Sequence, residues 1–181
     1  MVRQAEGGPM DQQVFLARLS GGVSQSITPD RRDIGYYTWI DNNHLALFRI
    51  EGESTRLEKY NILDQKSRKI TSEIGRSLWT DGSGAVFYVH KFSPDYWYLK
   101  KYNPEELTMD IIVQTPGETE DFALAPDGTI FMGLHGKLYT YHPDYQTTWK
   151  EMADLSIYGI KNATRLAISP DGSKLVLVAT E

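Results

Sequence analysis

Apolar residues alternate with polar ones over short stretches of this chain, and turn residues end each stretch. The alternation has a period of two, as at Leu45 and Leu47 or at Leu175 and Leu177, and glycine, proline and aspartate interrupt it every 8 to 12 residues. This pattern predicts short β-strands throughout and no helix. The stretch at 103–107, "NPEEL", is predicted to be a turn because it aligns with strand-turn-strand segments elsewhere in the chain.

One hairpin pattern occurs four times. The last copy, "LAISPDGSKLVLVATE", has an apolar run, a Pro-Asp-Gly turn and a second apolar run, and it is preceded by "TWIDNNHLALFRI", "LWTDGSGAVFYVH" and "FALAPDGTIFMGL". The turn aspartates Asp41, Asp81, Asp127 and Asp171 are 40, 46 and 44 residues apart. A second pattern, "KLYTYHP" in its clearest copy, recurs with anchors 43, 42 and 39 residues apart. Two independent anchors therefore share one period.

The turns have a physical explanation. In Pro170-Asp171-Gly172 the proline presets φ, the aspartate side chain can accept hydrogen bonds from its own backbone, and glycine accepts the left-handed conformation. The same reasoning makes turn formation, rather than calcium binding, the expected role of the turn aspartates, because each turn supplies one carboxylate and lacks the alternating acidic residues of a calcium loop.

Four-stranded sheets that repeat every 40 to 45 residues are typical of a β-propeller. The predicted fold is all-β: a β-propeller of four-stranded antiparallel blades, with about four blades or as a fragment of a propeller of about six. Residues 1–181 are predicted to form one partial propeller domain, divided into a partial blade at 1–30, full blades at 34–73, 74–116 and 117–159, and a partial blade at 160–181.

Composition narrows the functional classes. The formal net charge is −5, the chain has no cysteine, and Arg31-Arg32 is its only adjacent arginine pair. Nucleic acid is therefore not expected as a partner, and a disulfide framework or thiolate metal site is excluded. No apolar run approaches the roughly 20 residues of a membrane-spanning helix, and the N-terminal residues show no signal peptide.

The repeats resemble those of bacterial TolB-like, WD40-like β-propellers. The typical repeat of that group reads S-P-D-G-x-x-[IL] followed by a strand of the form L-[YW]-x-[YW]-[DN]; "SPDGSKLVLV" at 169–178 and "KLYTYHP" at 137–143 fit it closely, whereas the copies at Asp41 and Asp81 lack the proline. The resemblance is to the C-terminal part of longer proteins. It implies a periplasmic or exported parent protein that has further repeats.

The final hairpin leaves two alternatives open. It could pair with residues 12–28 and close a four-bladed ring, or it could pair with strands from a longer parent, and we favour the second. Open blade edges also predict self-association of this chain.

Candidate chemistry is sparse. The four histidines, His44, His90, His135 and His142, show no metal-binding spacing, and no G-x-S-x-G nucleophile motif occurs. We therefore assign no catalytic residue, no metal site and no cofactor.

We instead predict a binding face from the geometry of a propeller. The loops that join one blade to the next lie on the same rim of the propeller as the loops between the second and third strands of each blade. The irregular "PDYW" at 94–97 is placed in one of these loops, as is His135. The candidates on this face are Arg31, Arg32, Asp33, Tyr36, Arg76, Asp95, Tyr96, Asp121 and His135.

Three functions compete. The favoured one is a non-enzymatic, TolB-like scaffold or protein-interaction module with a protein partner. The second is a fragment of the propeller domain of a prolyl-oligopeptidase-like serine peptidase, in which similar repeats precede a hydrolase domain. The third is a lactonase-like propeller enzyme, which would need carboxylates converging on a central metal.

Overall fold

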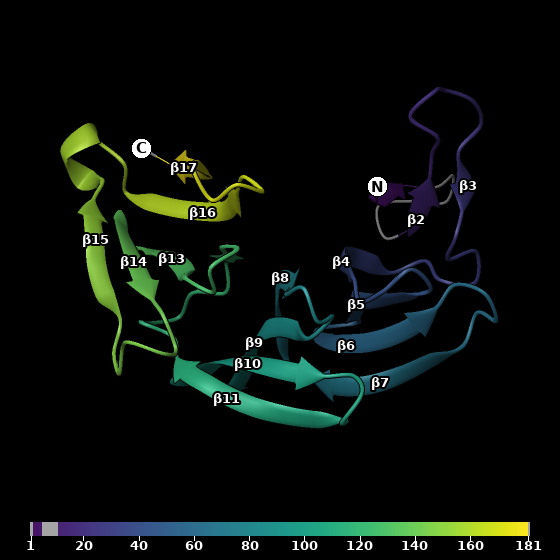
Figure 1. Ribbon diagram of the computed structural model, residues 1–181, viewed down its shortest axis with the longest axis horizontal. Helices are drawn as coiled ribbons and strands as arrows, with labels where there is room; N and C mark the ends of the chain where they lie inside the picture. Colours follow the sequence, from purple (N-terminus) through teal and green to yellow (C-terminus); the bar gives the residue numbers. More distant parts are fainter. Residues whose placement is uncertain (1, 5–10, 181) are drawn as a thin grey trace. The chain divides into compact units, whose positions relative to one another are not determined.

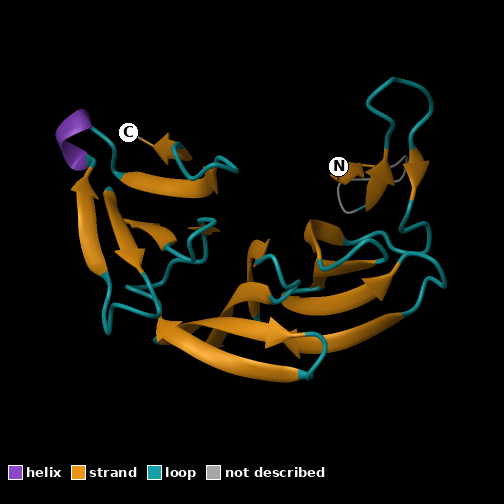
Figure 2. Ribbon diagram, viewed as in Figure 1, coloured by secondary structure: helices purple, strands orange, loops and turns teal. Residues whose placement is uncertain are grey.

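The computed structural model describes residues 2–4 and 11–180, and nearly all of their regular structure is antiparallel β-sheet (Figures 1 and 2). Three of the sheets in these residues have four strands, each pairing with the next along the chain. The first contains β4 (Ile34–Trp39), β5 (His44–Glu51), β6 (Ser54–Asn61) and β7 (Ser67–Ser72). The second contains β8 (Ile74–Thr80), β9 (Val86–Ser93), β10 (Tyr96–Asn103) and β11 (Thr108–Gln114). The third contains β12 (Phe122–Leu124), β13 (Ile130–Leu134), β14 (Lys137–Tyr141) and β15 (Lys150–Asp154).

Two smaller sheets complete the regular structure of these residues. The first has the order β1 (Val2–Gln4), β2 (Gln12–Leu16) and β3 (Gln25–Ser26). The last hairpin pairs β16 (Asn162–Ile168) with β17 (Leu175–Thr180). The all-β class with four-stranded antiparallel sheets, predicted from the repeats, is confirmed.

The chain divides into two compact units, Met1–Ile74 and Gly75–Glu181. In the N-terminal unit a cluster of buried side chains joins β2 to the sheet β4–β7. It contains Val14, Ile34, Leu45, Leu47 and Tyr60. The Tyr60 hydroxyl donates to Asp30 Oδ1 at 2.8 Å, and burial, followed by that hydrogen bond, raises the pKa of this phenol.

In the C-terminal unit the sheet β12–β15 is covered on both faces. On one face Ile130 and Met132 pack with Phe87, Val89 and Leu99 of the sheet β8–β11. The opposite face uses Ala123, Phe131 and Leu138 against Leu166, Leu175 and Leu177 of the hairpin β16–β17. Apolar burial on both faces is what blade-on-blade stacking requires.

The turn aspartates act as the sequence predicts. Asp41, Asp81, Asp127 and Asp171 each accept a hydrogen bond from the backbone N–H two residues later, at 2.7, 3.0, 2.9 and 3.1 Å. The two copies without proline make the same contact, so the aspartate is the common element of the turn. The stretch 104–107 is also a turn.

The structure corrects some local predictions. A short 3₁₀ turn, η1 (Ser156–Tyr158), occurs where no helix was expected. Tyr36, Arg76 and Tyr96 were placed in loops, but they lie on β4, β8 and β10. Only Pro94 and Asp95 form the turn before β10, because the strand pairing of β9 and β10 continues to Tyr96 and Ser93.

Candidate functional site

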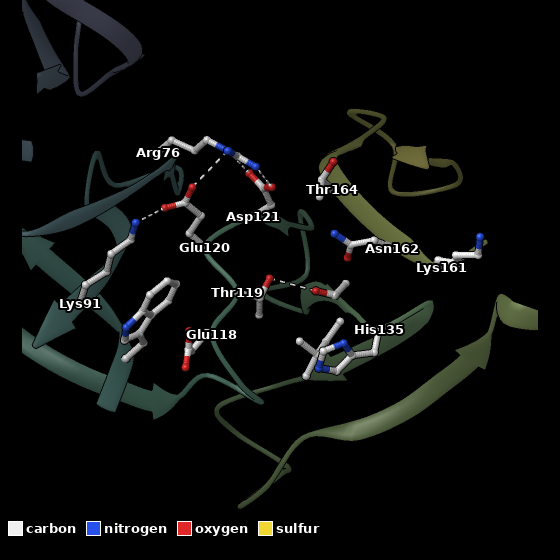
Figure 3. A pocket seen from close by; sticks show the side chains of 13 residues that line it. Arg76, Lys91, Glu118, Thr119, Glu120, Asp121, His135, Lys161, Asn162 and Thr164 are labelled. Atoms are coloured by element: carbon white, nitrogen blue, oxygen red, sulfur yellow. Dashed lines mark hydrogen bonds and ion pairs between the residues drawn. The ribbon is translucent and has the colours of Figure 1, made fainter. Parts of the chain in front are cut away.

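A charged cavity of about 410 Å³ lies in the C-terminal unit, where the loop before β12, the turn between β13 and β14 and the start of β16 meet (Figure 3). We call it the charged cavity. Its volume falls within the range of roughly 300–1,000 Å³ typical of ligand pockets. Its lining residues are Arg76, Lys91, Trp97, Glu118, Thr119, Glu120, Asp121, Gly133, Leu134, His135, Lys161, Asn162 and Thr164.

Asp121 is the most buried charged group of this cavity, with a side chain only 4% exposed. Arg76 on β8 donates from Nε to Asp121 Oδ1 at 2.8 Å and makes a second, short contact from Nη2 to Oδ2. Arg165 Nη1, on β16, lies 3.5 Å from the same Oδ1. Burial raises the pKa of Asp121, while the Arg76 guanidinium opposes that rise. One carboxylate thus links residues that are 44 and 45 positions away in the sequence.

A second ion-pair group lies beside the first. Glu120 contacts Arg76 Nη1 at 3.2 Å and Lys91 Nζ at 2.5 Å. The Lys91 ammonium also lies 4.8 Å from the centre of the Trp97 ring, a cation–π distance. Arg76 is therefore shared between two neighbouring carboxylates, and this wall of the cavity is held by charges that satisfy one another.

Two stretches of irregular backbone lie next to residues of this lining, one on β16 and one between β13 and β14. The register of β16 and β17 shifts between Thr164 and Ala167, and Arg165 has a φ of 52° at this bulge. Bulges redirect side chains, and this one brings Arg165 to Asp121. His135 and Gly136 form the two-residue turn between β13 and β14, with φ values of 48° and 70°. A Cβ at position 136 would lie 2.4 Å from the Ile160 carbonyl oxygen, so only glycine allows this turn to approach the chain before β16.

Four polar side chains of the lining remain open to solvent. Glu118, His135, Lys161 and Asn162 are exposed, and their side chains make no hydrogen bond or ion pair within the part of the chain that the structure describes. The Thr119 hydroxyl, in contrast, is buried and donates to the Gly133 carbonyl at 2.9 Å. The cavity thus combines a wall of internally paired charges with polar groups available to a ligand.

No family model matches this sequence, and no curated protein matches it. Solved structures do match its fold. TolB from Acinetobacter baumannii superposes with a TM-score of 0.75 and 16% identity over 98% of this chain. This chain has the fold of a TolB-like β-propeller.

Two other solved structures illustrate the range of propellers that are similar. A chain of a nidogen/laminin complex gives a TM-score of 0.70 at 13% identity over 93% of this chain, and a puromycin hydrolase gives 0.67 at 16% over 98%. The chain spans 45% of the TolB structure, 64% of the nidogen/laminin chain and 31% of the puromycin hydrolase. At such low sequence identity, the structural similarity shows the fold alone. The function has to be argued from the site.

The structure brings three of the nine candidate residues together in the charged cavity: Arg76, Asp121 and His135. Asp95 lines a smaller hollow of about 210 Å³ that shares Trp97 and Glu118 with the cavity. Tyr96, the next residue, is 53% exposed at the start of β10.

The other four candidates belong to the N-terminal unit, and none of them lines the charged cavity. Arg31 pairs with Asp30 at 2.5 Å, and Arg32 lies 3.5 Å from Asp11. Asp33 accepts from Arg49 Nε at 2.8 Å, and the Tyr36 ring meets Phe48 edge-on at 5.7 Å. These contacts account for all four residues within their own unit.

Sequence reasoning missed several cavity residues that a closer comparison of the repeats could have found. Glu118 and Glu120 precede Asp121 in the acidic run "ETED" of the same loop. Arg165 stands six residues before Asp171, as Asp121 stands six before Asp127, so the two occupy the same repeat position. Trp97 belongs to the irregular "PDYW" at 94–97 but was not chosen from it, and Lys91 and Lys161 gave no sequence signal.

A second cavity, of about 480 Å³, lies at the opposite end of the same strands; we call it the turn cavity. Its lining is more apolar and includes Trp79, Phe87 and Leu124. Three prolines of this end, Pro126, Pro143 and Pro170, also line it. Its ion pair, Lys101 Nζ to Asp81 Oδ2 at 3.1 Å, is internal.

No metal-binding cluster and no membrane-spanning helix occurs among the described residues. Among residues 2–4 and 11–180, no group of three or more histidine, aspartate or glutamate side chains is arranged to hold a metal ion. In the same residues, no helix has the length and apolar character needed to cross a membrane.

Proposed function

We propose that this TolB-like propeller is a non-enzymatic module that binds a protein or peptide partner at the charged cavity. The observation that supports the proposal is that the lining has two parts, a wall of charges that pair with one another and a set of polar side chains open to solvent. Arg76, Glu120 and Asp121 are held by ion pairs, whereas Lys161 and Asn162 have no partner among the described residues. Side chains that ion pairs already hold in place favour binding, because few side chains lose conformational freedom when a ligand binds.

The lining favours binding over catalysis. It includes no serine among the described residues, and the buried Thr119 hydroxyl is used by the Gly133 carbonyl. A nucleophile would need an activating base within hydrogen-bond reach. His135, the histidine of the lining, is exposed and makes no hydrogen bond with any described residue.

Site-specific photo-crosslinking tests the proposal. A photoreactive amino acid at position 162, in the charged cavity, is expected to capture one defined partner protein. The matched control places the same probe at position 174, which is exposed at the turn end. Capture should be lost in the variant Lys161→Glu and retained in Lys174→Glu. Equal capture from both positions, or none from position 162, would contradict the proposal.

The peptidase alternative rests on the similarity to puromycin hydrolase. It predicts that the gene continues after Glu181 into a hydrolase domain with a G-x-S-x-G motif, so sequencing the parent gene decides it. Turnover of a fluorogenic peptide or ester by this chain itself would overturn the non-enzymatic assignment.

Two further proposals concern the setting of the protein. The TolB-like resemblance supports a periplasmic or exported parent, which cell fractionation with an antibody to this chain would test. Self-association through open blade edges stays a prediction, and sedimentation velocity over a hundredfold range of concentration would reveal it as a concentration-dependent mass.

A further inference from the structure

The charges of the cavity fall into a paired set and an unpaired set. Arg76, Lys91, Glu120 and Asp121 neutralise one another through contacts of 2.5 to 3.2 Å and one shorter contact. Glu118 and Lys161 carry opposite charges and have no hydrogen bond or ion pair within the described residues. Only these two charged side chains of the lining are therefore available to pair with a ligand without breaking an existing ion pair.

The two unpaired charges come from different walls. Figure 3 shows Glu118 on the side of the cavity that carries Lys91, whereas Lys161 lies across the cavity beside Asn162, at the start of β16. A ligand that satisfies both must therefore carry a positive group at one end and a negative group at the other.

The lining between these walls suits a peptide. Leu134 and Trp97 provide apolar surface, and the adjacent residues Lys161 and Asn162 each carry a hydrogen-bond donor that suits a carboxylate. The volume of about 410 Å³ suits a ligand of small-molecule size.

We infer that the charged cavity binds a short zwitterionic peptide, with its terminal ammonium group at Glu118 and its terminal carboxylate at Lys161 and Asn162. This inference rests on the proposed function, because it specifies the ligand of the same cavity. An internal segment of a partner protein could present the same two charges on lysine and aspartate side chains. The free peptide is the ligand we infer, and the experiment distinguishes it from such an internal segment.

The test follows backbone amide signals of the full chain by NMR during titration with di-, tri-, tetra- and penta-alanine that have free termini. At least one length should shift the signals of residues 118–121, 133–135 and 161–164. Amidating the carboxylate or acetylating the amine of that peptide should each weaken binding about tenfold or more, the effect expected from losing a charge-assisted hydrogen bond.

Two variants test which end of the peptide binds at Glu118 and which at Lys161. In Lys161→Ala the preference for the free over the amidated peptide should fall to the part that Asn162 supplies, and in Glu118→Gln acetylation should no longer weaken binding. The matched controls Lys174→Ala and Glu106→Gln change exposed residues outside the cavity and should retain the full preference for free termini.

Several results would overturn the inference. These are equal binding of doubly blocked and free peptides, unchanged end preferences in the two cavity variants, or binding only of a blocked peptide with internal lysine and aspartate. If no peptide binds but position 162 still captures a protein partner, the inference fails and the proposed function stands. If both experiments fail, the cavity has no binding role.

Discussion

The two ends of the strands in the C-terminal unit use the same residue type in opposite ways. At the turn end, Asp171 is exposed and accepts hydrogen bonds from Ser169 and Ser173, its sequence neighbours, which lower its pKa to about 2. At the cavity end, Asp121 is buried and contacts Arg76 and Arg165, and burial raises its pKa. Asp171 stabilises its own turn through residues next to it in the sequence. Asp121 instead links two strands far apart in the sequence, so its contacts form only when both strands are in place.

The largest effect is expected from Asp121→Ala. Removal of the buried carboxylate takes from Arg76 one of its two acidic partners and from Arg165 its contact at 3.5 Å, and breaking a buried ion pair costs about 3 kcal/mol. Chemical denaturation of the full chain measures the loss in the free energy of unfolding. Asp95→Ala, an exposed control, should change it by less than about 0.5 kcal/mol. Equal effects of the two variants would mean that the contacts of the buried Asp121 carboxylate add no stability.

Two glycines, one at each end of the strands, differ in how closely the chain packs around them. A Cβ at Gly133, in the cavity lining, would lie 2.3 Å from the Ala163 carbonyl oxygen, so Gly133→Ala should push β13 and β16 apart and cost about 2 kcal/mol. At the turn end, a Cβ at Gly82 meets nothing within 4 Å, and Gly82→Ala should be close to neutral. Thermal unfolding of both variants tests the difference, and a tolerated alanine at 133 would show that the two strands can separate without cost.

Thr119→Val probes the loop that carries the acidic run. The change removes the hydroxyl that donates to the Gly133 carbonyl and leaves that acceptor unpaired, at a cost of about 1 kcal/mol. The control is Thr148→Val, at an exposed position between β14 and β15. If urea denaturation gives the same midpoint for both variants, the hydrogen bond does not hold this loop.

The smallest effect is expected at Asp171, and it depends on pH. Because the folded pKa of about 2 lies below the ordinary value of 3.8, the ionised form stabilises the fold above about pH 4. This contribution is lost as the pH falls through 2. Asp171→Asn should therefore be slightly less stable than the parent at pH 6, and the difference should shrink towards pH 2.

A carbon-detected NMR titration of the carboxyl groups checks the sign directly. Asp171 should titrate near 2 and Asp121 above 3.8. A titration of Asp121 below the ordinary value would mean that Arg76 and Arg165 outweigh the burial of the carboxylate.

Much of the fold could be predicted because it is local. The period-two pattern and the turn aspartates identified the strand-rich repeats, since a turn such as Pro170-Asp171-Gly172 contains most of its own hydrogen bonds. Strand ends were less accessible. Tyr36, Arg76 and Tyr96 lie on strands because pairing with the neighbouring strand, rather than local residue preference, decides where a strand stops.

The candidate site was only partly predictable. Asp121 and His135 were chosen from loop geometry, but their partners come from other repeats. Arg165 reaches Asp121 because β16 has a bulge at Arg165, where φ is positive. No residue type in this stretch of the sequence predicts that bulge.

The sequence by itself determined the repeat, the four-stranded sheets and the turns, because each depends on contacts between residues close together in the chain. The tertiary structure alone decided which charges are satisfied and which stay open. Glu120 and Glu118 are two residues apart in the same loop, yet one is paired with Lys91 and the other faces solvent. The physical reason is that ion pairing and burial depend on the distances between strands of different repeats, which local patterns do not fix.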